Sequence, residues 1–168
     1  MMRRNFLLST AAMAATAIGG GLFFGSRAKS REAAFPVSLT PDEWRAKLTP
    51  EQFAVLREES TERPFTSPLN DNKQTGVYAC AGCDTPAYSS ANKYDSKTGW
   101  PSFWAPLSAS AIGTRTDYAL IYPRTEVHCA TCGGHFGHIF DDGPAPTGKR
   151  HCLNGVALAF KPGATTAS

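Results

Sequence analysis

Five cysteines constrain the fold of this 168-residue chain more than any other feature, because four of them form two Cys-x-x-Cys pairs. The pairs are Cys80/Cys83 and Cys129/Cys132, and Cys152 stands alone. Each Cys-x-x-Cys turn supplies two thiolates to one metal, and two such turns complete a tetrahedral shell around zinc. The fold must therefore bring together two turns that are separated by 45 residues.

The four paired cysteines have other interpretations. In an oxidising compartment they could form two disulfides, and four thiolates also suit an iron site. Either pair could be a redox-active dithiol, although no strand–helix–strand pattern of the thioredoxin type surrounds it. We favour one structural Zn²⁺ per chain, because Ala81-Gly82 inside the first pair, and Ala130-Thr131 followed by Gly133-Gly134 at the second, let the backbone turn around a metal.

Residues 1–28 have the layout of an export signal. Arg3 and Arg4 precede an uncharged stretch that ends only at Arg27. Adjacent arginines resemble a twin-arginine signal, which the twin-arginine export machinery uses to send folded proteins to the bacterial periplasm. Metal loaded before such export would protect the thiolates. The alternative is an uncleaved signal that anchors the protein in the inner membrane, although its glycines make it a poor span.

The charge balance argues against nucleic-acid binding. Three of the 17 basic residues lie in residues 1–28, so the remainder carries 14 basic and 14 acidic residues. A nucleic-acid binder is expected to keep a basic excess on its folded part. We therefore expect no nucleic-acid partner.

The rest of the chain predicts a mainly β domain. We expect a linker over 29–36, a domain over 37–161 and a flexible tail over 162–168. Two Thr-Pro sequences, at Thr40 and Thr49, predict short helices with capping boxes, whose buried side chains would be Trp44, Leu48, Phe53, Val55 and Leu56. Short strands without intervening helices indicate a small antiparallel barrel or two packed sheets. The expected strands are 76–79, 86–89, 118–122, 125–128, 135–140 and 156–160.

Cys152 is a candidate nucleophile. An unpaired cysteine is often an inert buried residue, but Arg150 and His151 precede this one. Cationic neighbours lower the pKa of a thiol and enrich the reactive thiolate. Asn154 would lie on the same face of a strand as Cys152 and Arg150, since side chains two apart point the same way.

Four motifs, given below in their order along the chain, resemble the hallmark segments of zinc-containing methionine-R-sulfoxide reductases of the B type. The resemblance covers about residues 37–161 and includes the two cysteine pairs. The motifs are Gly99-Trp100-Pro101-Ser102-Phe103, Arg124-Thr125-Glu126-Val127, Gly137-His138-Ile139-Phe140-Asp141-Asp142-Gly143-Pro144 and Arg150-His151-Cys152-Leu153-Asn154.

This resemblance implies two antiparallel sheets that form an open barrel, with zinc remote from the active site. It also implies that the Cys152 thiolate attacks the sulfur of an R-configured methionine sulfoxide, free or in a peptide, and becomes a sulfenic acid. His138 would supply a proton to the departing oxygen, with His135 assisting through water.

The resemblance further implies the residues that surround the reacting atoms. Trp100 would receive the S-methyl group of the substrate, with Phe103 and His135 as further substrate-binding residues. Asn154 would hold substrate or water by hydrogen bonds, and Arg150 would help to keep Cys152 ionised. We expect His135 and His138 to face opposite sides of a strand, because they are three residues apart.

One position departs from a common pattern of the family. Many members carry a second redox cysteine just before the Gly-Trp-Pro segment, where this chain has Thr98. Without it, an external thioredoxin-like or small-thiol reductant would have to regenerate Cys152 directly. Two other functional classes remain open on the residues alone: a zinc-stabilised binding module without catalysis, and a thiol–disulfide oxidoreductase that uses one Cys-x-x-Cys pair.

Overall fold

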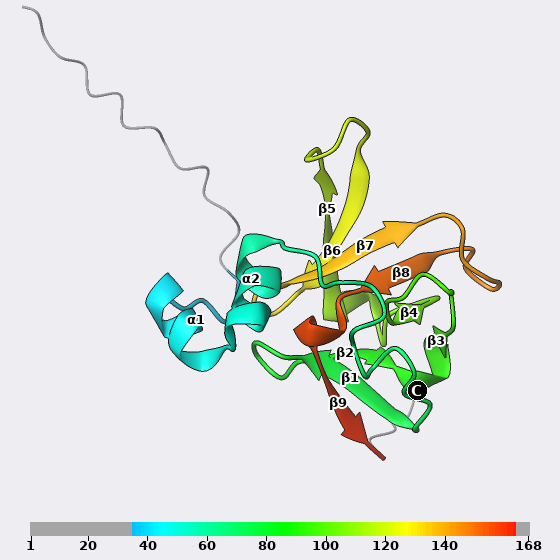
Figure 1. The fold of residues 1–168 in the computed structure, drawn as a ribbon, viewed down its shortest axis with the longest axis horizontal. Helices are drawn as coiled ribbons and strands as arrows, with labels where there is room; N and C mark the ends of the chain where they lie inside the picture. Colours follow the sequence, from blue (N-terminus) through cyan, green and yellow to red (C-terminus); the bar gives the residue numbers. More distant parts are fainter. Residues whose placement is uncertain (1–34, 164–168) are drawn as a thin grey trace, which may run out of the picture. The chain divides into compact units, whose positions relative to one another are not determined.

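A computed structural model describes residues 35–163. The expected export signal, most of the linker and residues 164–168 lie outside this range. Figure 1 shows two short helices followed by a series of strands. The helices are α1 (Pro41–Lys47) and α2 (Pro50–Glu58), and the strands are β1 (Gly76–Cys80), β2 (Pro86–Ser89), β3 (Lys93–Tyr94), β4 (Ser102–Phe103), β5 (Ile112–Asp117), β6 (Arg124–Cys129), β7 (His135–Phe140), β8 (Arg150–Leu153) and β9 (Leu158–Pro162).

The strands form two antiparallel sheets, as predicted. The smaller sheet has the order β2-β1-β9, and the larger one has the order β3-β4-β8-β7-β6-β5. All of the pairings are antiparallel. The larger sheet is open, because β3 and β5 are its two edges in the part of the chain that the structure describes.

Both predicted helices are confirmed with their caps. The Thr40 and Thr49 side chains each accept a hydrogen bond from the backbone three residues on, and Glu43 and Gln52 bond back to the cap. Each cap contributes about 1 kcal/mol, which matters for helices of only two turns. The five apolar residues expected to face inward are all buried.

The strand predictions were partly wrong. Tyr118–Tyr122 is not a strand: β5 ends at Asp117, and this apolar segment connects β5 to β6. Its residue types favour a strand, but the hairpin turns there and leaves them in solvent. The strand expected over 156–160 starts two residues later, after a 3₁₀ turn. Pro162, which we expected in the tail, is the last residue of β9.

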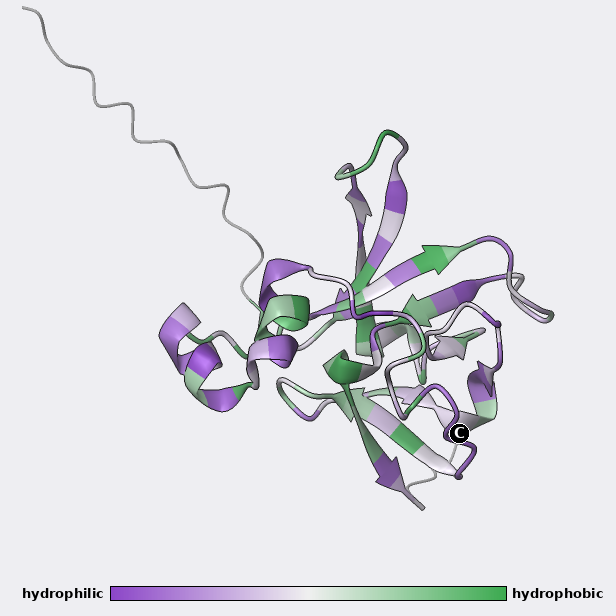
Figure 2. Cartoon of the chain, viewed as in Figure 1, coloured by the Kyte–Doolittle hydropathy of each residue, from purple (hydrophilic) through white to green (hydrophobic). Residues whose placement is uncertain are grey.

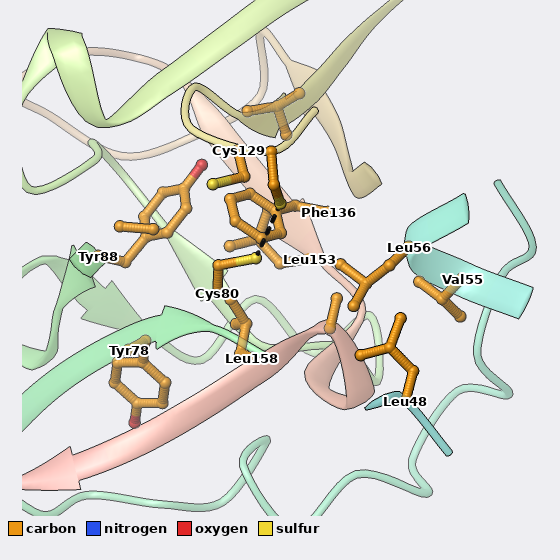
Figure 3. Close-up of a cluster of buried hydrophobic side chains, with 14 of the residues drawn as sticks. Leu48, Val55, Leu56, Tyr78, Cys80, Tyr88, Cys129, Phe136, Leu153 and Leu158 are labelled. Atoms are coloured by element: carbon orange, nitrogen blue, oxygen red, sulfur yellow. Dashed lines mark hydrogen bonds between the residues drawn. The ribbon is translucent and has the colours of Figure 1, made fainter. Parts of the chain in front are cut away.

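The core lies between the two sheets and reaches the helices. The Phe103 ring lies 5.0 Å from the ring of Tyr78 and 4.8 Å from that of Tyr88, centroid to centroid. Phe136 and Leu153, from the larger sheet, are fully buried in the same cluster (Figure 3). Among residues 35–163, no helix has the length and apolar character that crossing a bilayer requires.

Candidate active site

Four cysteines converge from hairpin turns of the two different sheets. Cys80 ends β1, with Cys83 in the turn that leads to β2, while Cys129 ends β6, with Cys132 in the turn that leads to β7. Figure 3 shows Cys80 and Cys129 among the buried side chains of the core. The sulfur atoms of all four lie within 4.8 Å of one another. The two distant turns are therefore brought together, as the spacing required.

The sulfur positions fit a tetrahedral metal better than disulfides. The Sγ atoms of Cys80 and Cys132 are 3.7 Å apart, and those of Cys83 and Cys129 are 3.5 Å apart. Four thiolates at 2.3 Å from one ion would be about 3.8 Å apart. A disulfide requires about 2.05 Å. All five cysteines are free, and these four could hold one metal ion.

Arg57 on α2 supports this cluster from outside. Its Nη1 donates to the backbone oxygen of Cys132 at 3.0 Å, and its Nη2 lies 3.8 Å from the Cys132 sulfur. The guanidinium also stacks 4.6 Å from the Trp44 ring. A cation beside a thiolate offsets part of the negative charge that four thiolates bring to one ion. The helices are thus tied to the cluster as well as to the core.

Cys152 lies at the centre of the larger sheet. It is paired with Ser102 on β4 and with His138 on β7. Residues directly opposite each other in a sheet point to the same face. The register extends this row across all six strands, where its members are Tyr94, Ser102, Cys152, His138, Glu126 and Arg115.

A cavity of about 150 Å³ opens above Cys152. Four of the predicted site residues line it: Cys152, His138, Asn154 and Trp100. A cavity of this size holds a group about as large as benzene, so it accommodates one side chain. The other lining residues are Thr61, Arg124, Gly137, Phe140 and Leu153.

Three predicted site residues do not line this cavity. Phe103 is fully buried in the core, because it pairs with His151 and shares the face opposite to Cys152. This placement corrects the substrate-binding role expected for Phe103. His135 is buried beside Glu126. Arg150 makes two hydrogen bonds of 2.8 Å to Asp142 and stacks on Phe140.

Burial raises the pKa of the Cys152 thiol, contrary to our expectation of a lowered one. Thr98 and Arg150 lower that pKa, but burial outweighs them. His151 does not lower the pKa of Cys152, because its side chain points to the core, where its Nδ1 is 3.0 Å from the Tyr88 hydroxyl. Burial lowers the pKa of His151 to about 4, so the ring is neutral near pH 7.

The hydroxyl groups of Thr98 and Ser102 lie beside the Cys152 sulfur. The Thr98 hydroxyl lies 3.8 Å from that sulfur. The Ser96 hydroxyl bonds both Thr98, at 2.8 Å, and Ser102, at 2.7 Å. These groups can stabilise a thiolate by hydrogen bonds, but they cannot form a disulfide with it.

His138 was predicted at the cavity, but its hydrogen-bond partner Asp117 was not. His138 Nε2 lies 2.8 Å from Asp117 Oδ2, and Arg124 Nη2 donates to the same oxygen at 2.5 Å. Burial lowers the pKa of His138, while the hydrogen bond to Asp117 opposes that change. Asp117 ends β5, and no motif singled it out.

His135 and His138 lie on one face of β7, and our prediction of opposite faces was wrong. Their ring centroids are 5.4 Å apart. The register with β6 shifts between Val127 and His128, so β7 holds one extra residue there. Such a bulge reverses the alternation of side chains. A bulge is set by strand pairing, and the pattern of residues did not reveal it.

Glu126 fixes the orientation of His135. Its two carboxylate oxygens lie 2.8 Å from Nδ1 of His135 and 2.8 Å from Nδ1 of His128. Burial raises the pKa of this carboxyl, but the two histidines and Arg115 together outweigh burial and hold it at about 2. The carboxylate is therefore ionised at neutral pH. Glu126 belongs to one of the four sequence motifs, but the sequence did not indicate its role.

The backbone of Glu62 holds the side chains of Asn154 and Trp100 in place. The Asn154 side chain accepts from the Glu62 N–H at 2.8 Å and donates to the Phe136 carbonyl at 2.9 Å. Trp100 Nε1 donates to the Glu62 carbonyl at 2.9 Å. The Asn154 carboxamide thus uses two of its four hydrogen-bonding positions on backbone, and one N–H remains for a ligand. Glu62 went unnoticed in the sequence.

Comparisons with known proteins agree with this geometry. The family model described as "SelR domain" matches residues 48–162. A "Peptide methionine sulfoxide reductase MsrB" of Pseudomonas putida is 53% identical over 128 residues, which are 75% of this chain and 95% of that protein. The protein of the same name from Hahella chejuensis is 49% identical over 124 residues, covering 74% of this chain and 89% of its own length. With its cysteine cluster, its Cys152 cavity and these matches, the chain belongs to the SelR domain family.

Proposed function

We propose that this protein reduces methionine sulfoxide to methionine, with Cys152 as the nucleophile. The observation that carries the proposal is the cavity itself. It has room for one side chain and places a thiol beside an indole and an imidazole. The resemblance to B-type reductases and the names of the relatives support the same reaction, and the resemblance adds the preference for the R epimer.

The chemistry balances with groups that the cavity supplies. The Cys152 thiolate attacks the sulfoxide sulfur, and the sulfoxide oxygen takes up one proton. The methionine S–O bond breaks, an O–Sγ bond to Cys152 forms, and the oxygen leaves with Cys152 as a hydroxyl group. The products are methionine and the sulfenic acid of Cys152. His138 in its protonated form is placed to deliver a proton, and Asp117 favours that form. Trp100 gives the S-methyl group an apolar surface.

An external thiol completes the cycle. One thiol condenses with the sulfenic acid, releasing water and leaving a mixed disulfide. A second thiol attacks this disulfide and releases Cys152 as a thiol, and the reductant leaves as its own disulfide. Thr98 next to Cys152 supports this route, because a hydroxyl cannot resolve the sulfenic acid as a disulfide. The four clustered cysteines converge on one point, which argues against their use as a redox dithiol.

We further propose that the four cysteines bind Zn²⁺ and that the protein acts in the periplasm. Cys80, Cys83, Cys129 and Cys132 would hold the ion, which links the two sheets and takes no part in the reaction. The twin arginines Arg3 and Arg4 support export through the twin-arginine machinery. Mass spectrometry of periplasmic protein would determine whether the signal is cut.

The test is a turnover assay with dithiothreitol on separate R and S epimers of N-acetylmethionine sulfoxide. We expect turnover of the R epimer by the wild type and none by Cys152→Ser. A single turnover without reductant should yield one methionine per chain and a sulfenic acid on Cys152 that dimedone traps. If Cys152→Ser retained wild-type turnover, the proposal would be wrong.

A further inference from the structure

Exposed apolar side chains are concentrated in two segments. Among residues 35–163, the large hydrophobic residues that are exposed are Phe65, Tyr118, Leu120, Ile121 and Tyr122. The last four form the connection between β5 and β6, which we call the hairpin tip. Figure 2 shows this connection as an apolar loop at the end of a protruding hairpin. The four exposed residues of the hairpin tip mark an interaction site, whereas Phe65 by its exposure alone would not.

The hairpin tip is attached directly to the cavity. Asp117 and Arg124, the residues that flank it, form an ion pair, and Arg124 lines the cavity. Asp117 Oδ1 accepts the N–H of Ala119 in the tip at 2.7 Å, while its Oδ2 lies 2.8 Å from His138. One carboxylate therefore contacts both the tip and the imidazole of the cavity.

Phe65 is attached to another part of the cavity rim. Its N–H donates to the Gly99 carbonyl at 2.7 Å, and Gly99 precedes Trp100, which lines the cavity. The Phe65 side chain is 70% exposed, and its φ is 63°. A bulky residue in the left-handed region is costly and tends to occur where a site needs it.

The size of the cavity determines what these segments can meet. It holds one side chain, so a polypeptide that places an oxidised methionine there must lay its neighbouring residues on the rim. Successive residues of an extended chain advance by about 3.3 Å, so the neighbours on either side lie within reach of rim groups. A permanent partner on the same residues would instead obstruct the entrance.

We propose that Phe65 and the hairpin tip form an apolar docking surface for the residues that flank an oxidised methionine. The preferred substrate is then a polypeptide segment with apolar flanks, as unfolding exposes. This inference rests on the proposed function, and it adds a sequence preference that the reaction alone does not require.

The test compares three substrates with dithiothreitol. They are N-acetylmethionine R-sulfoxide, a pentapeptide with leucine on both sides of the oxidised methionine, and a pentapeptide with serine there. The enzymes are the wild type, the double variant Leu120→Ser/Ile121→Ser, and the matched control Leu120→Ile/Ile121→Leu. Phe65→Ser tests the second segment.

We expect the wild type to favour the leucine peptide over the serine peptide by roughly tenfold in kcat/KM, as expected for partial burial of apolar surface. The double variant should lose this preference through a higher KM and retain wild-type turnover of N-acetylmethionine sulfoxide. The control variant should keep the preference.

Equal kcat/KM for the two peptides in the wild type would overturn the proposal. So would a double variant that lowers all three activities equally, or one that changes only self-association or vesicle binding. Turnover of the N-acetyl substrate tests the proposed function separately. Binding of the fluorescently labelled leucine peptide to Cys152→Ser measures docking without turnover, and equal binding after the hairpin substitutions would also overturn the proposal.

Discussion

The cysteine cluster and the Cys152 cavity use the same side chain in opposite ways. In the cluster, Cys80, Cys129 and Cys132 are buried and face one another across two hairpin turns. In the cavity, Cys152 is half-buried and is surrounded by hydroxyl, imidazole and indole groups. Thiolates that converge on one point can be held by one ion and are withdrawn from chemistry. The isolated thiol stays available.

The two regions also differ in how they are built. Each half of the cluster is local, because a turn of four residues delivers two sulfurs. The cavity is assembled from β6, β7 and β8, with contributions from the segments at Thr61 and Trp100. Substitutions in the cluster should therefore affect the whole fold, while those in the cavity should affect the reaction.

The largest expected effect is that of Cys80→Ser. A structural zinc site contributes about 10–16 kcal/mol in zinc-finger peptides, which is as large as the whole stability of a typical domain. We expect the variant to lose its metal and its cooperative fold. Zinc analysis and thermal unfolding by circular dichroism measure this. A metal-free variant that melts at the wild-type temperature would contradict the structural role of the cluster.

Cys152→Ser should show the reverse behaviour. Loss of a nucleophile lowers turnover by about 10⁴-fold or more, while a near-isosteric change at a half-buried position costs at most about 1 kcal/mol. We expect full zinc content and a Tm within about 4 °C of the wild type. If the variant were active, or if it lost zinc, the separation between the two regions would not hold.

Asp117→Asn tests the positioning of His138. We expect kcat/KM to fall by about 10–100-fold, which is less than the roughly 10²–10⁴-fold that a general acid itself contributes, because Asp117 only positions His138. The carboxylate raises the pKa of His138 against burial, so its removal lowers that pKa further. Protonated His138 is then lost at lower pH, and the falling limb of the pH–rate profile moves toward acid.

Arg124 lowers the same pKa of His138, so Arg124→Met should move the falling limb of the pH–rate profile in the opposite direction, toward higher pH. Unchanged limbs in both variants would mean that Asp117 has only a structural role.

Protonation of His151 at low pH should have a smaller effect, on the free energy of unfolding. Its pKa is about 4 in the folded protein, against about 6.5 in an unfolded chain. The unfolded state therefore binds more protons between these values, and the free energy of unfolding falls as pH drops from 6.5 toward 4. The loss should reach about 2 kcal/mol by pH 4.5.

Urea unfolding at a series of pH values would measure this loss, with zinc content determined at each pH. His151→Gln removes the titrating group and should be less sensitive over the same window. An identical slope in the two proteins would show that His151 is not the cause.

The parts of the molecule that were predicted from sequence are those set by local rules. Capping boxes fixed both helices, and Cys-x-x-Cys spacing indicated the cluster, because each depends on residues within one or two turns. The segment Tyr118–Tyr122 misled the prediction. Its residues have high β propensity, which describes their fit to a half-buried sheet and cannot detect that the hairpin turns there.

Asp117 and Glu126 could not be assigned roles from the pattern. Asp117 reaches His138 only because β5 and β6 pair, and Glu126 reaches His135 only because β7 bulges. The pKa of Cys152 was misjudged for a related reason. Sequence neighbours suggested two cations, but strand alternation sent His151 to the core and burial outweighed Arg150.

The sequence by itself determined which sulfurs are paired and which one is alone, and also the helix caps and the family resemblance, because these are properties of residue types at fixed spacing. Tertiary structure alone decided which groups face Cys152, what protonation they favour and where apolar residues stay exposed. Those properties depend on strand register and burial, which arise only when segments distant in the chain pack together.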